Sequence, residues 1–106
     1  MPAVPRVHFI ENNNRMRPIP NSSEWESGYW YRFGKTNAAA LVGGGIYFHT
    51  ARSEPSYGGG IITAYRIQPT GQFRGRYVFT YRPDPAFVGV FAGSGSWSWR
   101  YKKIVW

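Results

Sequence analysis

The chain has 106 residues, a formal net charge of +8 and no cysteine. This length fits a single domain (residues 1–106) with its own core, and the lack of cysteine excludes disulfides and thiolate metal sites. No stretch approaches membrane-spanning length and the N-terminal region lacks the apolar run of a signal peptide, so we expect a cytoplasmic protein that makes no membrane contact.

Proline and asparagine interrupt the first part of the chain, so residues 1–20 are predicted to form an irregular N-terminal arm. The first ordered element is a strand at residues 27–33, in which aromatic side chains alternate with other types. Residues 36–42 then combine a capping residue, an alanine run and a terminating glycine run. This combination predicts one short helix.

Segments with period-two alternation follow, separated by glycine, proline and small polar residues. They predict strands at 46–50, 60–67, 76–82 and 97–102, with a short edge strand at 87–91.

Alternation also assigns faces within these strands. In the first of them, Ile46 and Phe48 fall on one face and Tyr47 and His49 on the other. The side chains expected in the core are Phe48, Ile61, Tyr77 and Phe79.

Five or six short strands and one helix predict a mainly β (α+β) fold. We expect a small curled antiparallel sheet or pseudo-barrel, with the helix covering an open end. The glycine run at 58–60 has two interpretations, a flexible hairpin entry or a place where phosphate approaches bare backbone amides. The hairpin entry is preferred, because the helix and lysine of a nucleotide-binding loop do not follow the run.

Charge and aromatic content together favour nucleic acid as the partner. Lysine and arginine number 13 against five acids, and 19% of the residues are Phe, Tyr or Trp. Most of the cations are arginines, whose planar guanidinium holds phosphate or a base edge bidentately and stacks on rings. Flat rings beside guanidinium groups suit a polyanion with stackable bases. The alternative is scattered charge that only keeps molecules apart.

Two segments resemble a known family: LVGGGIYFH at 41–49, a glycine turn between a short helix and an aromatic strand, and GIITAYRI at 60–67. Together they look like the central part of the PUA-like superfamily, whose EVE and ASCH members have a comparable order of elements. The resemblance covers about residues 38–82, and it implies a small pseudo-barrel that binds RNA or a modified base between aromatic side chains. The chain also resembles uncharacterised small proteins of mobile gene cassettes, which implies no activity.

A base pocket in such a fold has aromatic walls and a cationic rim. Stacking one base on a ring contributes about 1 to 3 kcal/mol, and cations at the rim add an attraction that weakens with salt. Trp97 and Trp99 equally fit the core, because polar residues already occupy the face opposite them. The predicted walls are Trp25, Trp30, Tyr47, Trp97 and Trp99, and the predicted rim is Arg32, Arg52, Arg66, Arg82, Arg100, Lys102 and Lys103.

One set of residues suggests catalysis. His49, Arg52, Glu54 and Tyr57 lie in one strand and loop, and they match the base, phosphate clamp and acid of a small basic ribonuclease toxin. A lone histidine beside a strand end is more often structural, so the preferred interpretation is a non-catalytic module, with His49 the one catalytic candidate. Two histidines and five scattered acids show no metal-ligand spacing, so neither metal nor cofactor is predicted.

Two binding functions without nucleic acid remain as alternatives. Tyr, Trp, Arg and Gly are also favoured at protein interfaces, and the apolar C-terminal residues 104–106 suit edge-to-edge pairing in a homodimer. A concave aromatic pocket for a small anionic ligand is the other alternative. Salt dependence separates these functions, because phosphate contacts weaken steeply as salt rises.

Overall fold

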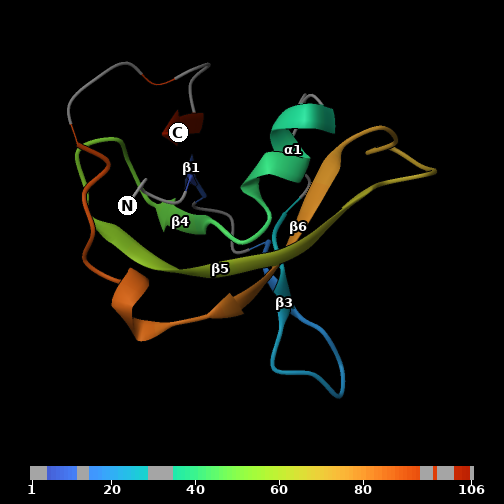
Figure 1. Cartoon of the computed structure of the whole chain (residues 1–106), viewed down its shortest axis with the longest axis horizontal. Coiled ribbons are helices and arrows are strands. Elements are labelled where there is room, and N and C mark those ends of the chain that lie inside the picture. The colour runs from blue at the N-terminus through green and yellow to red at the C-terminus, as the bar shows by residue number, and fades with distance from the viewer. Residues whose placement is uncertain (1–4, 12–14, 29–34, 94–96, 98–101, 106) are drawn as a thin grey trace.

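The computed structural model describes residues 5–11, 15–28, 35–93, 97 and 102–105. Within these residues the chain forms seven strands and one short α-helix, which confirms the predicted mainly β class (Figure 1). No helix of the described part is long and apolar enough to cross a membrane. The elements in chain order are β1 (Arg6–Ile10), β2 (Arg17–Pro18), β3 (Trp25–Glu26), α1 (Lys35–Leu41), β4 (Gly45–His49), β5 (Ser56–Ile67), β6 (Tyr77–Pro83), the 3-10 helix η1 (Pro85–Phe87) and β7 (Lys102–Val105).

The strands form one sheet in the order β2-β3-β6-β5-β4-β1-β7. Neighbouring strands are antiparallel except β1 and β4, which run parallel, so the curled sheet is mixed where an antiparallel one was expected. Parallel neighbours need a crossover connection, which the chain makes by way of β2, β3 and α1. In the described residues the end strands β2 and β7 do not pair with each other, so the sheet is curled and open.

The core lies between α1 and one face of the sheet. Figure 1 shows α1 over this face, and Ala38 and Leu41 are the helix residues that are fully buried there. Alternation along the strands decides which side chains join them, because successive residues point to opposite faces. The sheet contributes Val7, Phe9, Ile46, Phe48, Ile62, Tyr77, Phe79 and Tyr81 to this core.

Most elements predicted from the sequence are confirmed with small shifts at their ends. The helix begins one residue earlier than expected, and the strands predicted at 46–50, 60–67 and 76–82 correspond to β4, β5 and β6. Three of the four predicted core residues are buried, namely Phe48, Tyr77 and Phe79. Ile61 is only half-buried, because it lies on the face of β5 away from α1.

Two expectations about single segments were wrong. The N-terminal region contains β1, which lies between β4 and β7 and is buried at three of its five positions, so it is not wholly an irregular arm. Residues 87–91 are not an edge strand: η1 ends at Phe87, and residues 88–91 belong to no helix or strand. The Asp84 side chain starts η1 by accepting a hydrogen bond of 2.9 Å from the Ala86 amide.

The first and last predicted strands match only in part. β3 ends at Glu26, Ser27 and Gly28 are not in a strand, and the rest of the segment predicted at 27–33 lies outside the described residues. β7 begins at Lys102, while Trp97 lies in a connecting segment and residues 98–101 are not described. Of the described residues in these two predicted segments, only Lys102 lies in a strand.

The glycine run at 58–60 lies inside β5, so neither the hairpin entry nor the phosphate loop describes it. A Cβ on Gly59 would lie 2.0 Å from the Ile46 carbonyl oxygen, and a Cβ on Gly60 would lie 1.9 Å from that of Arg82. Any side chain at these two positions would push the neighbouring strands away. Gly58 differs, because a Cβ there would meet no atom within 4 Å.

Candidate functional site

An apolar hollow of about 300 Å³ opens beside β5 and is the strongest candidate site. Trp25 of β3 and Tyr81 of β6 are paired across the ladder, so their side chains share one face. The ring of Phe48 packs against Tyr81, with 5.3 Å between the ring centroids. The lining residues of this tryptophan hollow are Met16, Trp25, Phe48, Gly58, Gly59, Tyr81, Pro83, Asp84, Pro85 and Val88.

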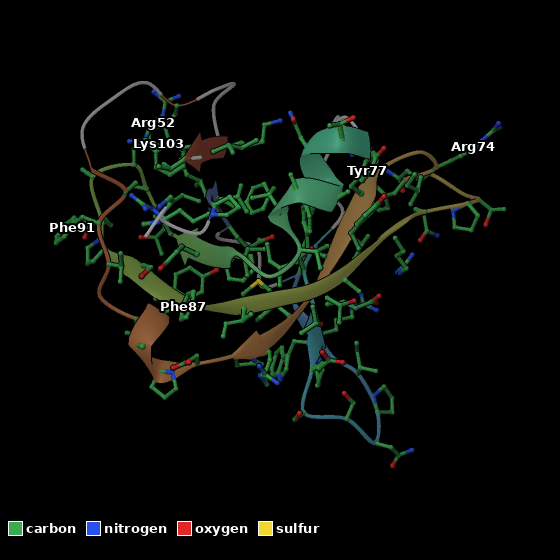
Figure 2. The ribbon with its side chains drawn as sticks, in the orientation of Figure 1. Arg52, Arg74, Tyr77, Phe87, Phe91 and Lys103 are labelled. Carbon is green, nitrogen blue, oxygen red and sulfur yellow. The ribbon has the colours of Figure 1, made fainter. Side chains whose placement is uncertain are left out.

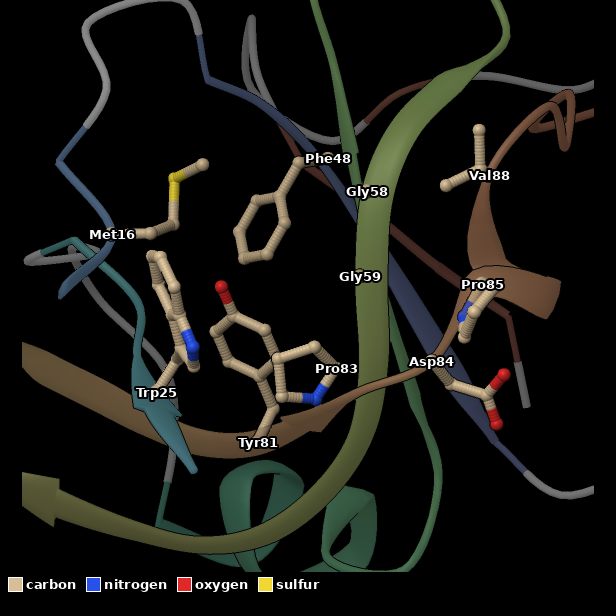
Figure 3. A pocket seen from close by; sticks show the side chains of 10 residues that line it. All are labelled: Met16, Trp25, Phe48, Gly58, Gly59, Tyr81, Pro83, Asp84, Pro85 and Val88. Atoms are coloured by element: carbon tan, nitrogen blue, oxygen red, sulfur yellow. The ribbon is translucent and has the colours of Figure 1, made fainter. Parts of the chain in front are cut away.

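The hollow continues across β5 because the strand has no side chains there. Figure 3 shows the aromatic residues on one side of β5 and Val88, Pro85 and Asp84 on the other, with Gly58 and Gly59 between them. The open space above Gly58 is thus part of the hollow. A flat ligand that enters it would contact rings on one side and bare backbone in the middle.

Three polar side-chain groups stand at this hollow, namely the Asp84 carboxylate, the Tyr81 hydroxyl and the indole N–H of Trp25. Asp84 is its only charged lining residue in the described part of the chain, and its Oδ1 accepts from Ala86, which leaves further acceptor positions on the carboxylate. Burial raises the pKa of the Tyr81 hydroxyl, so this group stays protonated at neutral pH. The hollow therefore suits an uncharged, planar ligand whose edge carries N–H donors.

Of the five predicted wall residues, Trp25 alone lines this hollow among the residues described. Trp25 is 37% exposed. Tyr47 lies on the opposite face of the sheet, stacked between His8 and Phe87. Trp97 packs edge-on against His8 and His49, while Trp30 and Trp99 lie outside the described residues.

The described members of the predicted cationic rim lie in different surroundings. Arg52 and Arg82 are exposed, but the Arg66 guanidinium forms an ion pair with Glu26 at 2.8 Å. Lys102 and Lys103, also predicted rim residues, are buried in β7, with exposed fractions of 9% and 7%. The two other predicted rim residues, Arg32 and Arg100, lie outside the described residues.

Lys103 illustrates why a cation in an alternating strand can be buried. Its backbone pairs with His8 of β1, and its Nζ donates hydrogen bonds to the carbonyl oxygens of Ala92 and Gly93, at 3.0 and 3.3 Å. These carbonyls belong to the segment after η1. The ammonium therefore links that segment to β7. Strand alternation alone does not reveal that a segment from elsewhere in the chain covers Lys103.

The catalytic candidate His49 is fully buried. Its Nδ1 lies 2.8 Å from the carbonyl oxygen of Glu54, and its Nε2 lies 2.8 Å from Nδ1 of His8. A carbonyl oxygen only accepts, so His49 Nδ1 carries the proton and His49 Nε2 accepts from His8. Both nitrogens of His49 are thus engaged, and neither is left to take a proton from a substrate.

Both imidazoles of this histidine pair are neutral. Burial lowers the pKa of His8 to about 3, and electrostatic interactions with His49, Arg6 and Lys103 act in the same direction. Burial also lowers the pKa of His49, although its hydrogen bond to Glu54 opposes this effect. The Nε2 atom of His8 is buried and has no hydrogen-bond partner among the described residues.

The side chains of the other members of the predicted catalytic set do not form one reactive site with His49. Arg52 and Glu54 are exposed, whereas His49 is buried. The Tyr57 hydroxyl donates to the carbonyl oxygen of Glu11, and burial and the Glu11 charge raise its pKa to about 12. In the described residues no three His, Asp or Glu side chains lie close enough to hold a metal ion.

Sequence reasoning missed several residues that matter here. Met16, Asp84 and Val88 line the tryptophan hollow, but each stands in an irregular segment without periodicity. His8 was placed in the arm, and its partner lies 41 residues away.

No match to the chain was found among protein-family models, curated proteins or solved structures.

Proposed function

We propose that the protein binds single-stranded nucleic acid without catalysing a reaction, and that one unpaired base enters the tryptophan hollow. The observation that carries the proposal is the pairing of Trp25 and Tyr81 on one face beside the side-chain-free backbone of Gly58 and Gly59. Base stacking on aromatic rings tolerates every base, because each base has a π face. The resemblance to the PUA-like superfamily agrees with such a pocket.

The polar groups favour the edge of a base over a phosphate. The Asp84 carboxylate would repel phosphate, whereas it accepts hydrogen bonds from ring or exocyclic N–H groups. A base inside a duplex cannot reach the hollow unless it is flipped out, which costs a few kcal/mol. Single strands are therefore the preferred ligand, and the net charge of +8 supplies long-range attraction.

The test measures binding of short labelled single-stranded RNA and DNA by fluorescence anisotropy, at low and at physiological salt. Two variants change the hollow from different sides: Trp25→Ala removes a stacking ring, and Gly58→Leu fills the open space. Their controls are Phe91→Ala, which removes an aromatic that is 63% exposed outside the hollow, and Ala64→Leu, which adds the same side chain to an exposed position of β5. Thermal unfolding confirms that all four variants are folded.

We expect Trp25→Ala to weaken binding by about 5- to 140-fold, which corresponds to the roughly 1 to 3 kcal/mol of one stacked base. Gly58→Leu should weaken binding at least as much, and both controls should bind like the unchanged protein. Equal affinity of all four variants would overturn the placement of the base. Failure of every oligonucleotide to bind at low salt would overturn the nucleic-acid function, and salt-independent self-association would favour the homodimer.

A further inference from the structure

A second hollow, of about 500 Å³, lies on the face of the sheet away from α1. Its lining residues are Arg6, Gly43, Gly44, Gly45, Tyr47, Ile61 and Phe87, and we call it the arginine hollow. The short helix η1 contributes to both hollows, since Pro85 lines the tryptophan hollow and Phe87 lines the arginine hollow. The two hollows are therefore adjacent at η1.

We propose that the arginine hollow and the adjacent Arg82 bind the phosphates of the same strand whose base occupies the tryptophan hollow. This inference rests on the proposed function and adds the path of the backbone. The base-binding hollow contains a carboxylate, so the strand's phosphates must be neutralised elsewhere on the molecule. The arginine hollow is the neighbouring site with the opposite charge.

Strand register places the two arginines on one face. Arg6 is paired with Gly45, Gly45 with Ile61, and Ile61 with Arg82, so these four positions form one row across β1, β4, β5 and β6. Directly paired residues share a face. Neighbouring strands lie about 4.8 Å apart, which separates the two backbones by about 14 Å and lets the guanidinium groups reach different phosphates of one strand.

Neither arginine is occupied by another protein group in the described part of the chain. Arg82 is exposed and Arg6 half-buried, and the side chain of neither forms a hydrogen bond or ion pair with a described residue. Arg66 offers the contrast, because Glu26 already neutralises it. A bidentate guanidinium is well matched to phosphate oxygens.

A stack of rings adjoins the arginine hollow, and two of its members, Tyr47 and Phe87, line that hollow. The rings of His8, Tyr47 and Phe87 stack in sequence, with centroid separations of 4.7 and 4.8 Å. Gly45 permits this arrangement, because a Cβ there would lie 2.9 Å from Cε2 of Phe87 and 3.1 Å from Cε2 of Tyr47. The rings are thus held in place, and sugar or base can lie over Phe87 while the phosphates contact the arginines.

The alternation of β6 links the two hollows directly. Tyr81 lines the tryptophan hollow and the next residue, Arg82, belongs to the row on the opposite face. A nucleic-acid chain that passes around the C-terminal end of β6, beside η1, meets the stacking surface on one face and Arg82 on the other. The geometry therefore assigns different parts of one nucleotide chain to the two faces.

The test compares Arg6→Gln and Arg82→Gln with the control Arg74→Gln, which removes the same charge from an exposed position. Arg74 lies in the connection between β5 and β6, and Figure 2 shows it on the opposite side of the molecule from Phe87. The readout is the affinity for a short single-stranded oligonucleotide over a range of salt concentrations. Each phosphate contact contributes about 0.7 to the slope of log affinity against log salt for single strands.

We expect each of Arg6→Gln and Arg82→Gln to reduce this slope by about 0.7 and to weaken binding at low salt, while Arg74→Gln changes neither. Trp25→Ala should lower the affinity with an unchanged slope. If Trp25→Ala weakens binding but all three arginine variants behave alike, the phosphate path is overturned and the proposed function stands. If no oligonucleotide binds, both are overturned.

Discussion

The Nδ1 atom of His8 lies 2.8 Å from the Nε2 atom of His49, so one hydrogen bond between two buried imidazoles joins the parallel strands β1 and β4. The carbonyl oxygen of Glu54 fixes the direction of this bond by accepting from the other nitrogen of His49. With both rings neutral, each N–H in this chain meets an acceptor, and only Nε2 of His8 has no partner among the described residues. A proton added to His49 would force His8 to move its own proton from Nδ1 to that partnerless, buried Nε2.

Acid should therefore destabilise the fold in a range where few other groups titrate. Below the usual histidine pKa of 6.5 the unfolded chain takes up protons, whereas folded His8 stays neutral until about pH 3. Stability is fully present above pH 6.5 and falls as the pH is lowered, by up to about 1.4 kcal/mol per pH unit for each histidine. Urea unfolding at several pH values measures this slope.

The matching control is His8→Phe, which keeps a ring beside Tyr47 but cannot titrate. This variant should lose a large part of the slope above the range where carboxylates titrate. A free energy of unfolding that stays constant between about pH 7 and about pH 5 in the unchanged protein would contradict the neutral pair.

Removing His49 should cost stability rather than activity. His49→Leu fills most of the volume but leaves the buried Nδ1–H of His8 without an acceptor, and we expect a loss of about 1 to 3 kcal/mol. Thr50→Ala, at the exposed neighbouring position, should change the free energy of unfolding by much less. Oligonucleotide affinity of the folded His49→Leu protein should be unchanged, and a large loss of binding would argue that the pair serves the ligand directly.

The glycine run of β5 provides a comparison of three adjacent positions. Gly59→Ala and Gly60→Ala place a Cβ about 2 Å from a carbonyl oxygen of β4 or β6, so the ladder must open and the proteins should be largely unfolded. Gly58→Ala meets open space and should unfold close to the temperature of the unchanged protein. Circular dichroism melting distinguishes them, and equal melting temperatures for the three variants would refute the close packing of β5.

The ion pair between Arg66 and Glu26 should contribute little. Both side chains are partly exposed, at 40% and 30%, and such pairs are typically worth about 0 to 1 kcal/mol. Arg66→Gln should therefore lower stability only slightly. It should also weaken oligonucleotide binding less than Arg82→Gln does, because the Arg66 guanidinium is already neutralised by Glu26. The same anisotropy titration tests this ranking, and a larger effect at Arg66 would reverse it.

Alternation predicted much of the sheet, because each strand has one face on the core. The separation of Ile46 and Phe48 from Tyr47 and His49 is confirmed: the first two belong to the buried core, and the second two contact His8 on the other face. The short helix followed from its alanine run and the glycines after it. These signals are local, so a single sequence carries them.

The remaining features of the fold and the site could not be predicted, because they depend on residues that are far apart in the sequence. β1 follows Pro5 directly and pairs with β4, which lies more than 30 residues further along the chain. The residues near 6–10 therefore carry no local signal that identifies the partner strand. The burial of Lys103 depends on the carbonyl oxygens of Ala92 and Gly93, and period-two alternation does not register such contacts. In the candidate site, Trp25 was identified from its type, but Asp84 and Gly58 join it only through tertiary structure.

Intermolecular NOEs between a bound single-stranded oligonucleotide and the aromatic protons of the full chain, measured by NMR, locate the bound base most directly. The placement of one base in the tryptophan hollow predicts NOEs from the protons of that base to the Trp25 indole and the Tyr81 ring. A bound strand whose base protons show NOEs to other residues, and none to Trp25 or Tyr81, would contradict it.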